Sequence, residues 1–262
     1  MMMHSRNAIQ KFRIDHLEVR VYSGKEEMGA AAAEFTAGQL HSVLTEKEHA
    51  NLMLATGASQ FSFLEAFKCI DSVDWSKIIT FHLDEYIGLG PDHPASFRNY
   101  LHERIIDEVQ PKQAYFLKGD AKDIPKEIKR YEKLLKDHPI DVACIGIGEN
   151  GHIAFNDPPV ADFRDPHRVK IVTLDQKSRQ QQVGEGWFNN IEEVPEQALS
   201  LTIPAIMESK VISCVVPDSR KAKAVHDALY GPVSTQCPAS VLRNHPNATL
   251  FLDVNSASEL EF

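Results

Sequence analysis

The chain has 262 residues, 43% of them hydrophobic, so it is long enough to bury a full core as one large domain or two small ones. It carries 28 Lys and Arg against 37 Asp and Glu, a net charge of −9. This balance argues against sequence-independent nucleic-acid binding, which needs a basic surface. An acidic protein can still bind a phosphorylated small molecule in a local pocket of backbone N–H groups and a few cations.

The four cysteines are scattered and form no CxxC pair, which favours a reducing compartment and argues against a structural zinc site. The first residues contain no apolar core of signal-peptide length. No run approaches the roughly 20 apolar residues of a membrane span. We therefore expect a soluble, cytoplasmic protein.

Apolar, β-branched runs alternate with helical patterns along the chain, after an N-terminal arm at 1–16 and within a single domain at 17–262. The predicted strands span 18–23, 51–56, 77–86, 115–117, 140–148, 168–174, 198–203, 210–216 and 248–254, and the predicted helices span 25–47, 59–69, 95–109, 124–138 and 219–231. This alternation predicts a doubly wound α/β fold, Rossmann-like and three-layered, with a mostly parallel sheet and helices on both faces. Such folds bind ligands at the carboxyl ends of their strands.

The first polar strand end is LATGASQ, 54–60. Thr56, Gly57, Ala58 and Ser59 stand between a strand and a helix, where backbone N–H groups and hydroxyls can hold a phosphate. The segment is not a Walker motif, because no GK[ST] follows. An ordinary turn with Ser59 as the helix N-cap explains the pattern equally well.

The second strand end is FHLDEY, 81–86, where a partly desolvated carboxylate at Asp84 could take a proton from carbon. In a continuous strand His82 and Asp84 share one face and Glu85 points the other way. Glu85 could equally be a structural salt-bridge partner. A metal site with His82, Asp84 and either His93 or His152 is a weak alternative, because no HExxH-like pattern supports it, and we expect no metal.

The third strand end is GENGHIAFNDPP, 148–159, which places His152 just beyond a glycine-rich turn. Imidazoles transfer protons near neutral pH, and a carboxylate at Asp157 could fix the tautomer and orientation of the ring. The alternative is a buried histidine that is satisfied by a backbone carbonyl. The position at the end of a parallel strand favours function.

The fourth strand end is DSRKAK, 218–223, where Lys221 lies in the first turn of a predicted helix. A lysine there opposes the helix dipole, and a bound phosphate would explain it. A solvated lysine is the alternative.

Together these four stretches resemble the glucosamine-6-phosphate deaminase (isomerase) family in order and spacing, over residues 17–255. TGAS resembles the family's phosphate loop, DEY and GENGHIAFNDPP resemble its signatures, and SRKAKAV resembles the segment of its phosphate lysine. The related 6-phosphogluconolactonases share the fold, but their motifs resemble DER and GHTASLFP more than the DEY and GHIAFN of this chain. The match is specific because four motifs agree.

The resemblance implies that Asp84, Asn150, His152 and Asp157 are catalytic, and that His152 opens the sugar ring while Asp84 moves the C2 proton to C1. Water then replaces the amine, and ammonia and fructose 6-phosphate are released. Thr56, Gly57, Ala58, Ser59, Arg179 and Lys221 would bind the phosphate. The resemblance implies no cofactor and no metal. We expect a small-molecule sugar phosphate as partner, no nucleic acid and no membrane, and we leave open whether the chain forms a homo-oligomer.

Two departures from the family bear on the substrate. Asp157 stands where the family has Glu, so we expect it to reach His152 only through a shifted backbone or water. The family's further phosphate arginine aligns at or near Gln182, and Arg179, about one helical turn away, could replace it. We also expect residues 158–190 to form a mobile cover over the substrate.

Two other functions fit the same pocket. A sugar-phosphate lactonase or a plain aldose–ketose isomerase would use the same fold, but lactone opening needs no exchange of a C2 proton. A non-enzymatic sugar-phosphate sensor would carry a basic DNA-binding module, for which a 15-residue arm is too short, and would not need Asp84 and His152 together.

Overall fold

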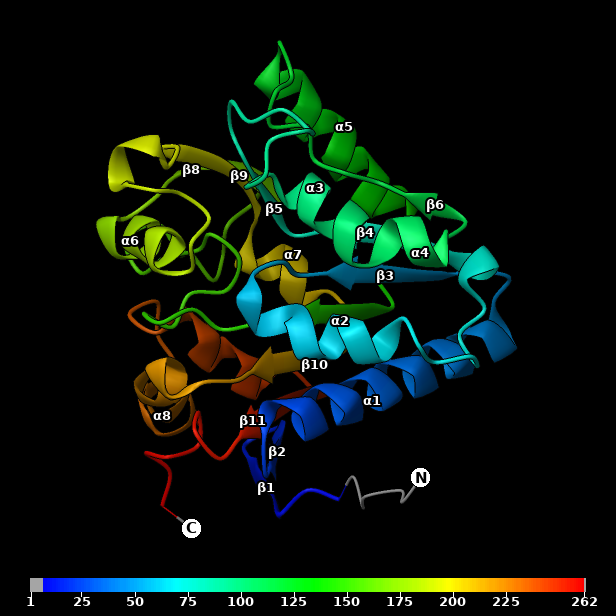
Figure 1. The fold of residues 1–262 in the computed structure, drawn as a ribbon, viewed down its shortest axis with the longest axis vertical. Coiled ribbons are helices and arrows are strands. Elements are labelled where there is room, and N and C mark those ends of the chain that lie inside the picture. Colours follow the sequence, from blue (N-terminus) through cyan, green and yellow to red (C-terminus); the bar gives the residue numbers. More distant parts are fainter. Residues whose placement is uncertain (1–6, 262) are drawn as a thin grey trace.

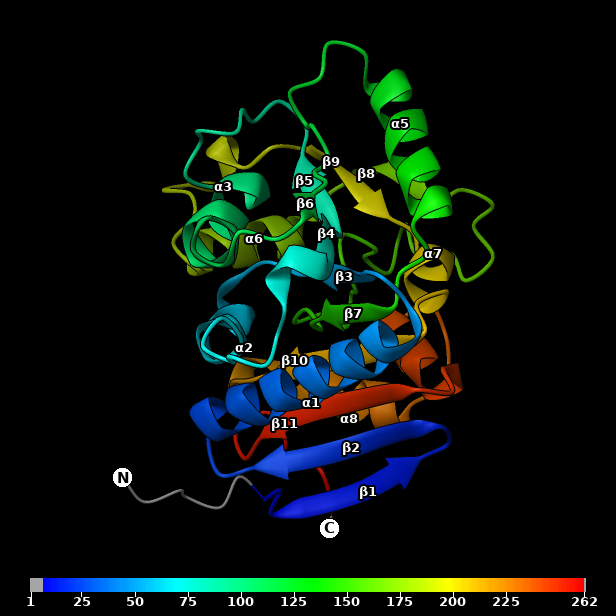
Figure 2. The same cartoon turned by 90° about the vertical axis from the view of Figure 1, so that its right-hand side faces the viewer.

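The computed structural model describes residues 7–261, apart from the side chain of Lys177, and is built around an eight-stranded sheet (Figures 1 and 2). In sheet order the strands are β1 (Gln10–Ile14), β2 (Leu17–Tyr22), β11 (Ala248–Asp253), β10 (Val211–Val216), β7 (Val142–Ile145), β3 (Ala50–Leu54), β4 (Ile78–His82) and β6 (Gln113–Ala114). Every neighbouring pair is parallel except β1–β2. The predicted doubly wound, mostly parallel sheet is confirmed.

Helices cover both faces of this sheet, as two separate apolar clusters show. One face carries α1 (Lys25–Glu46), α2 (Phe61–Phe67), α3 (Phe97–Leu101), a π-helical turn (His102–Ile106) and α4 (Asp107–Val109), and the other carries α5 (Ile124–Asp137), α7 (Ile203–Met207) and α8 (Ala222–Tyr230). In Figure 2, α1 crosses in front of β10 and β11 and α8 lies behind them. The buried strands need apolar side chains on both faces, which explains their near-continuous hydrophobic sequence.

A second, antiparallel sheet contains β5 (Asp84–Tyr86), β9 (Gln197–Leu201) and β8 (Val169–Thr173). The prediction of one strand over 77–86 is wrong, because the chain leaves the main sheet after β4. At that point the Leu83 carbonyl accepts a hydrogen bond from the Leu201 N–H (2.8 Å). His82 and Asp84 therefore belong to different sheets.

Other boundaries also differ from the predictions. Part of the expected arm is β1, whose residues 10–14 pair with β2 at the edge of the sheet, while residues 1–6 lie outside the described part of the chain. The short strand expected at 115–117 is β6, two residues earlier, and α7 was not expected. The division into 1–16 and 17–262 stays a prediction.

The strand order reverses between β3 and β7, because β4 lies on the far side of β3 and β10 on the far side of β7. Leu54 pairs with Cys144 across this boundary, and the Ala55 N–H donates to the Cys144 carbonyl (2.9 Å). A ligand crevice is expected outside the carboxyl ends of strands at such a reversal. All four polar strand ends follow the adjacent strands β10, β7, β3 and β4, so they meet at one edge.

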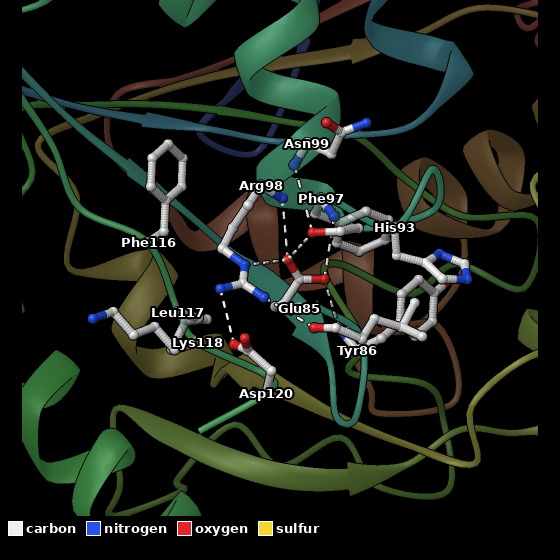
Figure 3. Close-up of polar contacts among 12 residues, drawn as sticks. Glu85, Tyr86, His93, Phe97, Arg98, Asn99, Phe116, Leu117, Lys118 and Asp120 are labelled. Atoms are coloured by element: carbon white, nitrogen blue, oxygen red, sulfur yellow. Dashed lines mark hydrogen bonds and ion pairs between the residues drawn. The ribbon is translucent and has the colours of Figure 1, made fainter. Parts of the chain in front are cut away.

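A buried ion pair fixes the chain where it enters the second sheet (Figure 3). The fully buried Glu85 carboxylate accepts hydrogen bonds from Arg98 Nε (3.2 Å) and from the Ser96 hydroxyl (2.9 Å). It also accepts from the Phe97 and Arg98 N–H groups at the start of α3. Burial raises the pKa of Glu85, and these donors and the Arg98 charge lower it in part. The interpretation of Glu85 as a structural salt-bridge partner is confirmed.

Replacing Arg98 with alanine should lower the free energy of unfolding by about 3 kcal/mol, because it leaves a buried carboxylate without its cation. Urea unfolding of Arg98→Ala would measure this. Lys133→Ala is the matched control, since it breaks the exposed Lys133–Asp137 pair (2.5 Å) and should cost no more than about 0.5 kcal/mol. Equal losses in the two variants would contradict the role given to Glu85 and Arg98.

Candidate active site

A cavity lies at the strand reversal, with about 590 Å³ of open space including its mouth. Six residues of the predicted site line it: Thr56, Gly57, Ser59, Asp84, His152 and Lys221. Apolar and glycine walls come from Leu83, Phe97, Gly146, Ile147, Gly148, Ala154 and Phe155. The structure thus brings the four polar strand ends together around one space.

The loop after β3 forms one end of the cavity. Gly57 has a φ of 97°, a conformation that favours glycine, and its carbonyl accepts a hydrogen bond from the Tyr100 hydroxyl (2.9 Å). The prediction of Ser59 as an N-cap is wrong, because Ala58–Gln60 form a short 3₁₀ turn and α2 begins after Gln60. The Ser59 hydroxyl instead lines the cavity, whereas Ala58 lines the neighbouring one.

Lys221 supplies a positive charge at the same end. It ends the 3₁₀ turn Ser219–Lys221 directly before α8, and its side chain is buried. Burial lowers the pKa of Lys221, while the carboxylates of Glu185 and Glu149 raise it in part. Among the described residues that line this cavity, Lys221 is the only lysine or arginine.

His152 lines the cavity with its ring held from behind. Its Nδ1 lies 2.8 Å from Asn150 Oδ1 and 2.9 Å from Asp157 Oδ1. Its backbone N–H also donates to Asn150 Oδ1 (3.1 Å). Two acceptors at Nδ1 favour the tautomer that carries its proton there, which leaves Nε2 to exchange protons in the cavity.

The ring also needs the glycine at position 148. A Cβ on Gly148 would overlap the His152 ring atoms Cε1, Nε2 and Cδ2. This glycine therefore makes space for the imidazole itself.

Asp157 is completely buried and holds this arrangement together. Its Oδ1 accepts hydrogen bonds from Asn150 Nδ2 (2.9 Å) and from the Ser178 hydroxyl (2.5 Å). Burial alone would raise the pKa of Asp157, but the hydrogen bonds and charge of His152, with those of Asn150 and Ser178, lower it to about 2. The shorter Asp157 reaches His152 in a direct contact (2.9 Å), so no bridging water is needed, and a shifted backbone as the reason stays a prediction.

Asp84 has the opposite environment. The residue is 7% exposed at the cavity wall, and no group in the described part of the chain donates a hydrogen bond to its carboxylate. Burial and the nearby Glu85 charge raise the pKa of Asp84 well above the usual value. A carboxylate that is destabilised in its charged form is a good proton acceptor, which suits a general base.

Arg179 does not line the cavity. Its Nη2 donates to the carbonyls of Ile191 (2.6 Å) and Val194 (2.9 Å), so the guanidinium ties down the chain after α6 (Gln176–Gly184). The expectation that Arg179 replaces the phosphate arginine is therefore not supported by its position. Gln182, at the aligned position, does line the cavity.

Sequence reasoning missed the helix α6 and its polar face. Ser178, Gln181, Gln182 and Glu185 are spaced three, one and three residues apart, so they lie on one side of a helix. The last three line the cavity, and Ser178 contacts Asp157. The helical spacing was the available signal. Within the expected cover at 158–190, β8 belongs to a sheet and α6 lies over the cavity, and the mobility of this segment stays a prediction.

His82 is separated from the site. Its Nε2 accepts a hydrogen bond from the Leu117 N–H (2.7 Å), and burial and the nearby Arg98 and Arg130 charges lower its pKa to about 3. His82 is therefore a neutral core residue. Within residues 7–261, no group of three or more His, Cys, Asp or Glu side chains is arranged to hold a metal ion. No described helix is long and apolar enough to cross a membrane.

A glycine-containing loop, a buried lysine, an unpaired carboxylate and an oriented imidazole, all at the reversal of a parallel sheet, are the groups expected of an α/β enzyme that moves protons on a small molecule. Residues 23–251 match the model of the family described as glucosamine-6-phosphate isomerases/6-phosphogluconolactonase. The chain belongs to this family.

Its relatives cover nearly the whole chain. A glucosamine-6-phosphate deaminase of Exiguobacterium sibiricum is 37% identical over 218 residues, which is 83% of this chain and 84% of the relative. One from Bacillus cereus is 35% identical over 242 residues, 92% of this chain and 88% of the relative. The structure of a monomeric glucosamine-6-phosphate deaminase superposes with a TM-score of 0.83 at 32% identity, covering 92% and 98% of the two chains. A 6-phosphogluconolactonase of Thermotoga maritima shares the fold, with a TM-score of 0.74 at 16% identity over 90% and 99% of the two chains.

Gly148→Ala should reduce turnover at least about 100-fold, because the added methyl group displaces the His152 ring from its place beside Asp157. Steady-state kinetics would measure this, with circular dichroism to show that the fold persists. Gly38→Ala is the control, since a Cβ there meets nothing within 4 Å, and it should leave turnover unchanged. A fully active Gly148→Ala enzyme would contradict the placement of His152.

The pKa of Asp84 also predicts how stability changes with pH. A raised folded-state pKa means that the native protein binds this proton more tightly than the unfolded chain does. The corresponding stability is present below the unfolded pKa and is lost as the pH rises through the folded pKa. Asp84→Asn lacks this titration. The free energy of unfolding of the variant, measured relative to that of the wild type, should therefore rise by about 1 kcal/mol or more between pH 4 and pH 8. A gap that stays constant with pH would contradict the buried, unpaired state of Asp84.

Proposed function

We propose that this chain converts glucosamine 6-phosphate and water into fructose 6-phosphate and ammonia. The observation that supports it most is that Asp84, His152 and the anion loop with Lys221 line one cavity. The relatives that are 35–37% identical carry the name glucosamine-6-phosphate deaminase.

In the first step, His152 transfers a proton to the ring oxygen of the sugar and the ring opens. Asp84 then removes the proton from C2 and delivers it to C1, which converts the aldose into an enolamine and then into an imine at C2. Water adds to C2, the C–N bond breaks, and ammonia leaves while C2 becomes the ketone. No electrons are exchanged with an external group, so the sequence needs no redox cofactor.

The supporting residues have distinct tasks in this proposal. Asp157 stays ionised at neutral pH and stabilises the protonated imidazole of His152, and Asn150 and Ser178 hold both partners in place. The loop of Thr56, Gly57 and Ser59 binds the phosphate group together with Lys221. Such a loop offers N–H and O–H donors to phosphate oxygens.

The runner-up function is lactone hydrolysis on the same fold. Lactone hydrolysis needs a water nucleophile but no base that removes a proton from carbon. The structure provides an unpaired carboxylate at Asp84, which suits such a base. The lactonase structures, at 13–19% identity, show a shared fold with this chain. We further propose that the enzyme acts in the cytoplasm on a free sugar phosphate, and that any assembly with further copies of the chain is not needed to complete the cavity.

The test is release of ammonia and fructose 6-phosphate from glucosamine 6-phosphate by the wild type, beside Asp84→Asn and His152→Ala. Each variant should lose at least about 100-fold in turnover, because general acid–base catalysis contributes that much. Asp84→Asn should in addition fail to exchange the C2 proton with deuterated solvent. A wild type that binds sugar phosphates but opens 6-phosphogluconolactone, with no C2 exchange, would replace the deaminase proposal with the lactonase one.

A further inference from the structure

The charge balance of the cavity does not match the charge of a phosphate ester. Its described lining contains one cation, Lys221, and two carboxylates, Asp84 and Glu185. Asp84 is accounted for as the base, but Glu185 is not used in the steps above. A phosphate group that carries nearly two negative charges would meet this second carboxylate at close range.

Glu185 lies at the phosphate end of the cavity. Its Oε2 is 3.9 Å from the point that a Cβ on Gly57 would occupy. It also lines the neighbouring cavity, which contains Ser59, Arg220 and Lys221. The Glu185 carboxylate therefore stands where the two cavities meet, beside the loop that would hold the phosphate.

The carboxylate is held in this position by its own segment. Gln181 Nε2 donates to Oε1 (2.8 Å) and Trp187 Nε1 donates to Oε2 (3.3 Å). The Trp187 indole packs edge-on against Tyr100 (5.9 Å between centroids), whose hydroxyl bonds to the Gly57 carbonyl. These contacts connect the Glu185 side chain to the anion loop itself.

The turn that carries Glu185 has open space beside its two glycines. Glu185 follows the last residue of α6, and the glycines on either side, Gly184 and Gly186, have no atom within 4 Å of an added Cβ. Neighbouring side chains thus leave space at the two positions that flank Glu185, and the turn is closed by hydrogen bonds from the Glu185 N–H to the Gln181 carbonyl (2.8 Å) and from the Gly186 N–H to the Val183 carbonyl (3.0 Å). A displacement of this turn would remove the negative charge without disturbing Asp157 or His152.

We propose that Glu185 is a built-in anion that competes with the phosphate group of the substrate for the loop and Lys221, and so sets the affinity of the enzyme for phosphorylated ligands. Binding of the phosphate moves the Glu185 turn out of the cavity. The inference rests on the proposed function for the identity of the substrate, but it concerns binding and not turnover. An acid side chain inside an anion site has the effect of raising the KM for the anion without slowing the chemical step.

Glu185→Gln keeps the size of the side chain and removes its charge, so it should tighten the binding of inorganic phosphate by about tenfold. Titration calorimetry measures this binding without any turnover. The KM for glucosamine 6-phosphate should fall by a similar factor, with kcat changed less than about twofold. Trp187→Phe removes one donor that holds Glu185 and should act in the same direction by about threefold.

Glu192→Gln is the matched control, because it removes the same charge from an exposed position a few residues further along. It should change phosphate affinity by less than about twofold. Adding Lys221→Met to Glu185→Gln should abolish the gain, which places the measured phosphate in this cavity. Unchanged or weaker phosphate binding in a folded Glu185→Gln protein overturns the proposal, as does a gain that survives Lys221→Met. Tighter phosphate binding without any turnover of glucosamine 6-phosphate supports the role of Glu185 and rejects the proposed function.

Discussion

The buried pair of Glu85 and Arg98 is the constraint on which the site depends. It joins the strand end that carries Asp84 to the first turn of α3, and Arg98 continues to Asp120 (2.9 Å). A charge of this kind is costly to bury unless its partners are fixed. The network (Figure 3) therefore holds the chain in the bend between the two sheets. Asp84 lines the cavity at this bend, while Glu85 stays in the protein interior.

The two functional carboxylates differ because their surroundings differ. Asp157 accepts hydrogen bonds at Oδ1 from Asn150 and Ser178 and contacts His152, and these contacts keep it charged and give the imidazole of His152 one orientation. Asp84 lies among apolar walls and near the charge of Glu85, and both favour its protonated form. Pairs of titratable groups whose environments shift their pKa values in opposite directions mark the acid–base assignments of an active site. In the proposed mechanism, the same residue type thus serves as an orienting anion at Asp157 and as a base at Asp84.

At the end of the cavity formed by the loop after β3 and Lys221, the electrostatic attraction of an anion is the important interaction. Backbone N–H groups and one buried lysine can attract an anion even in a protein with a net charge of −9. Glu185 opposes that attraction locally, and it comes from α6, an element that packs over the cavity and does not belong to the parallel sheet. The groups that attract phosphate and the carboxylate that repels it therefore come from separate elements. The affinity for phosphate then depends on where α6 and the glycine turn after it are placed.

The sequence by itself determined the order of strands and helices, the parallel sheet, and most residues of the site, because apolar strands and polar strand ends are local patterns. It also carried the four motifs that resemble one family. Only the tertiary structure decided which of these residues meet. The strand 77–86 breaks because Leu83 bonds to Leu201, far along the chain, and no local pattern contains that partner. Arg179 turns to the carbonyls of Ile191 and Val194, and Asp157 reaches His152 directly, because packing sets side-chain direction. Ser178 and Glu185 join the site only once α6 has folded over the sheet. The sequence of one element does not determine how far it lies from another element.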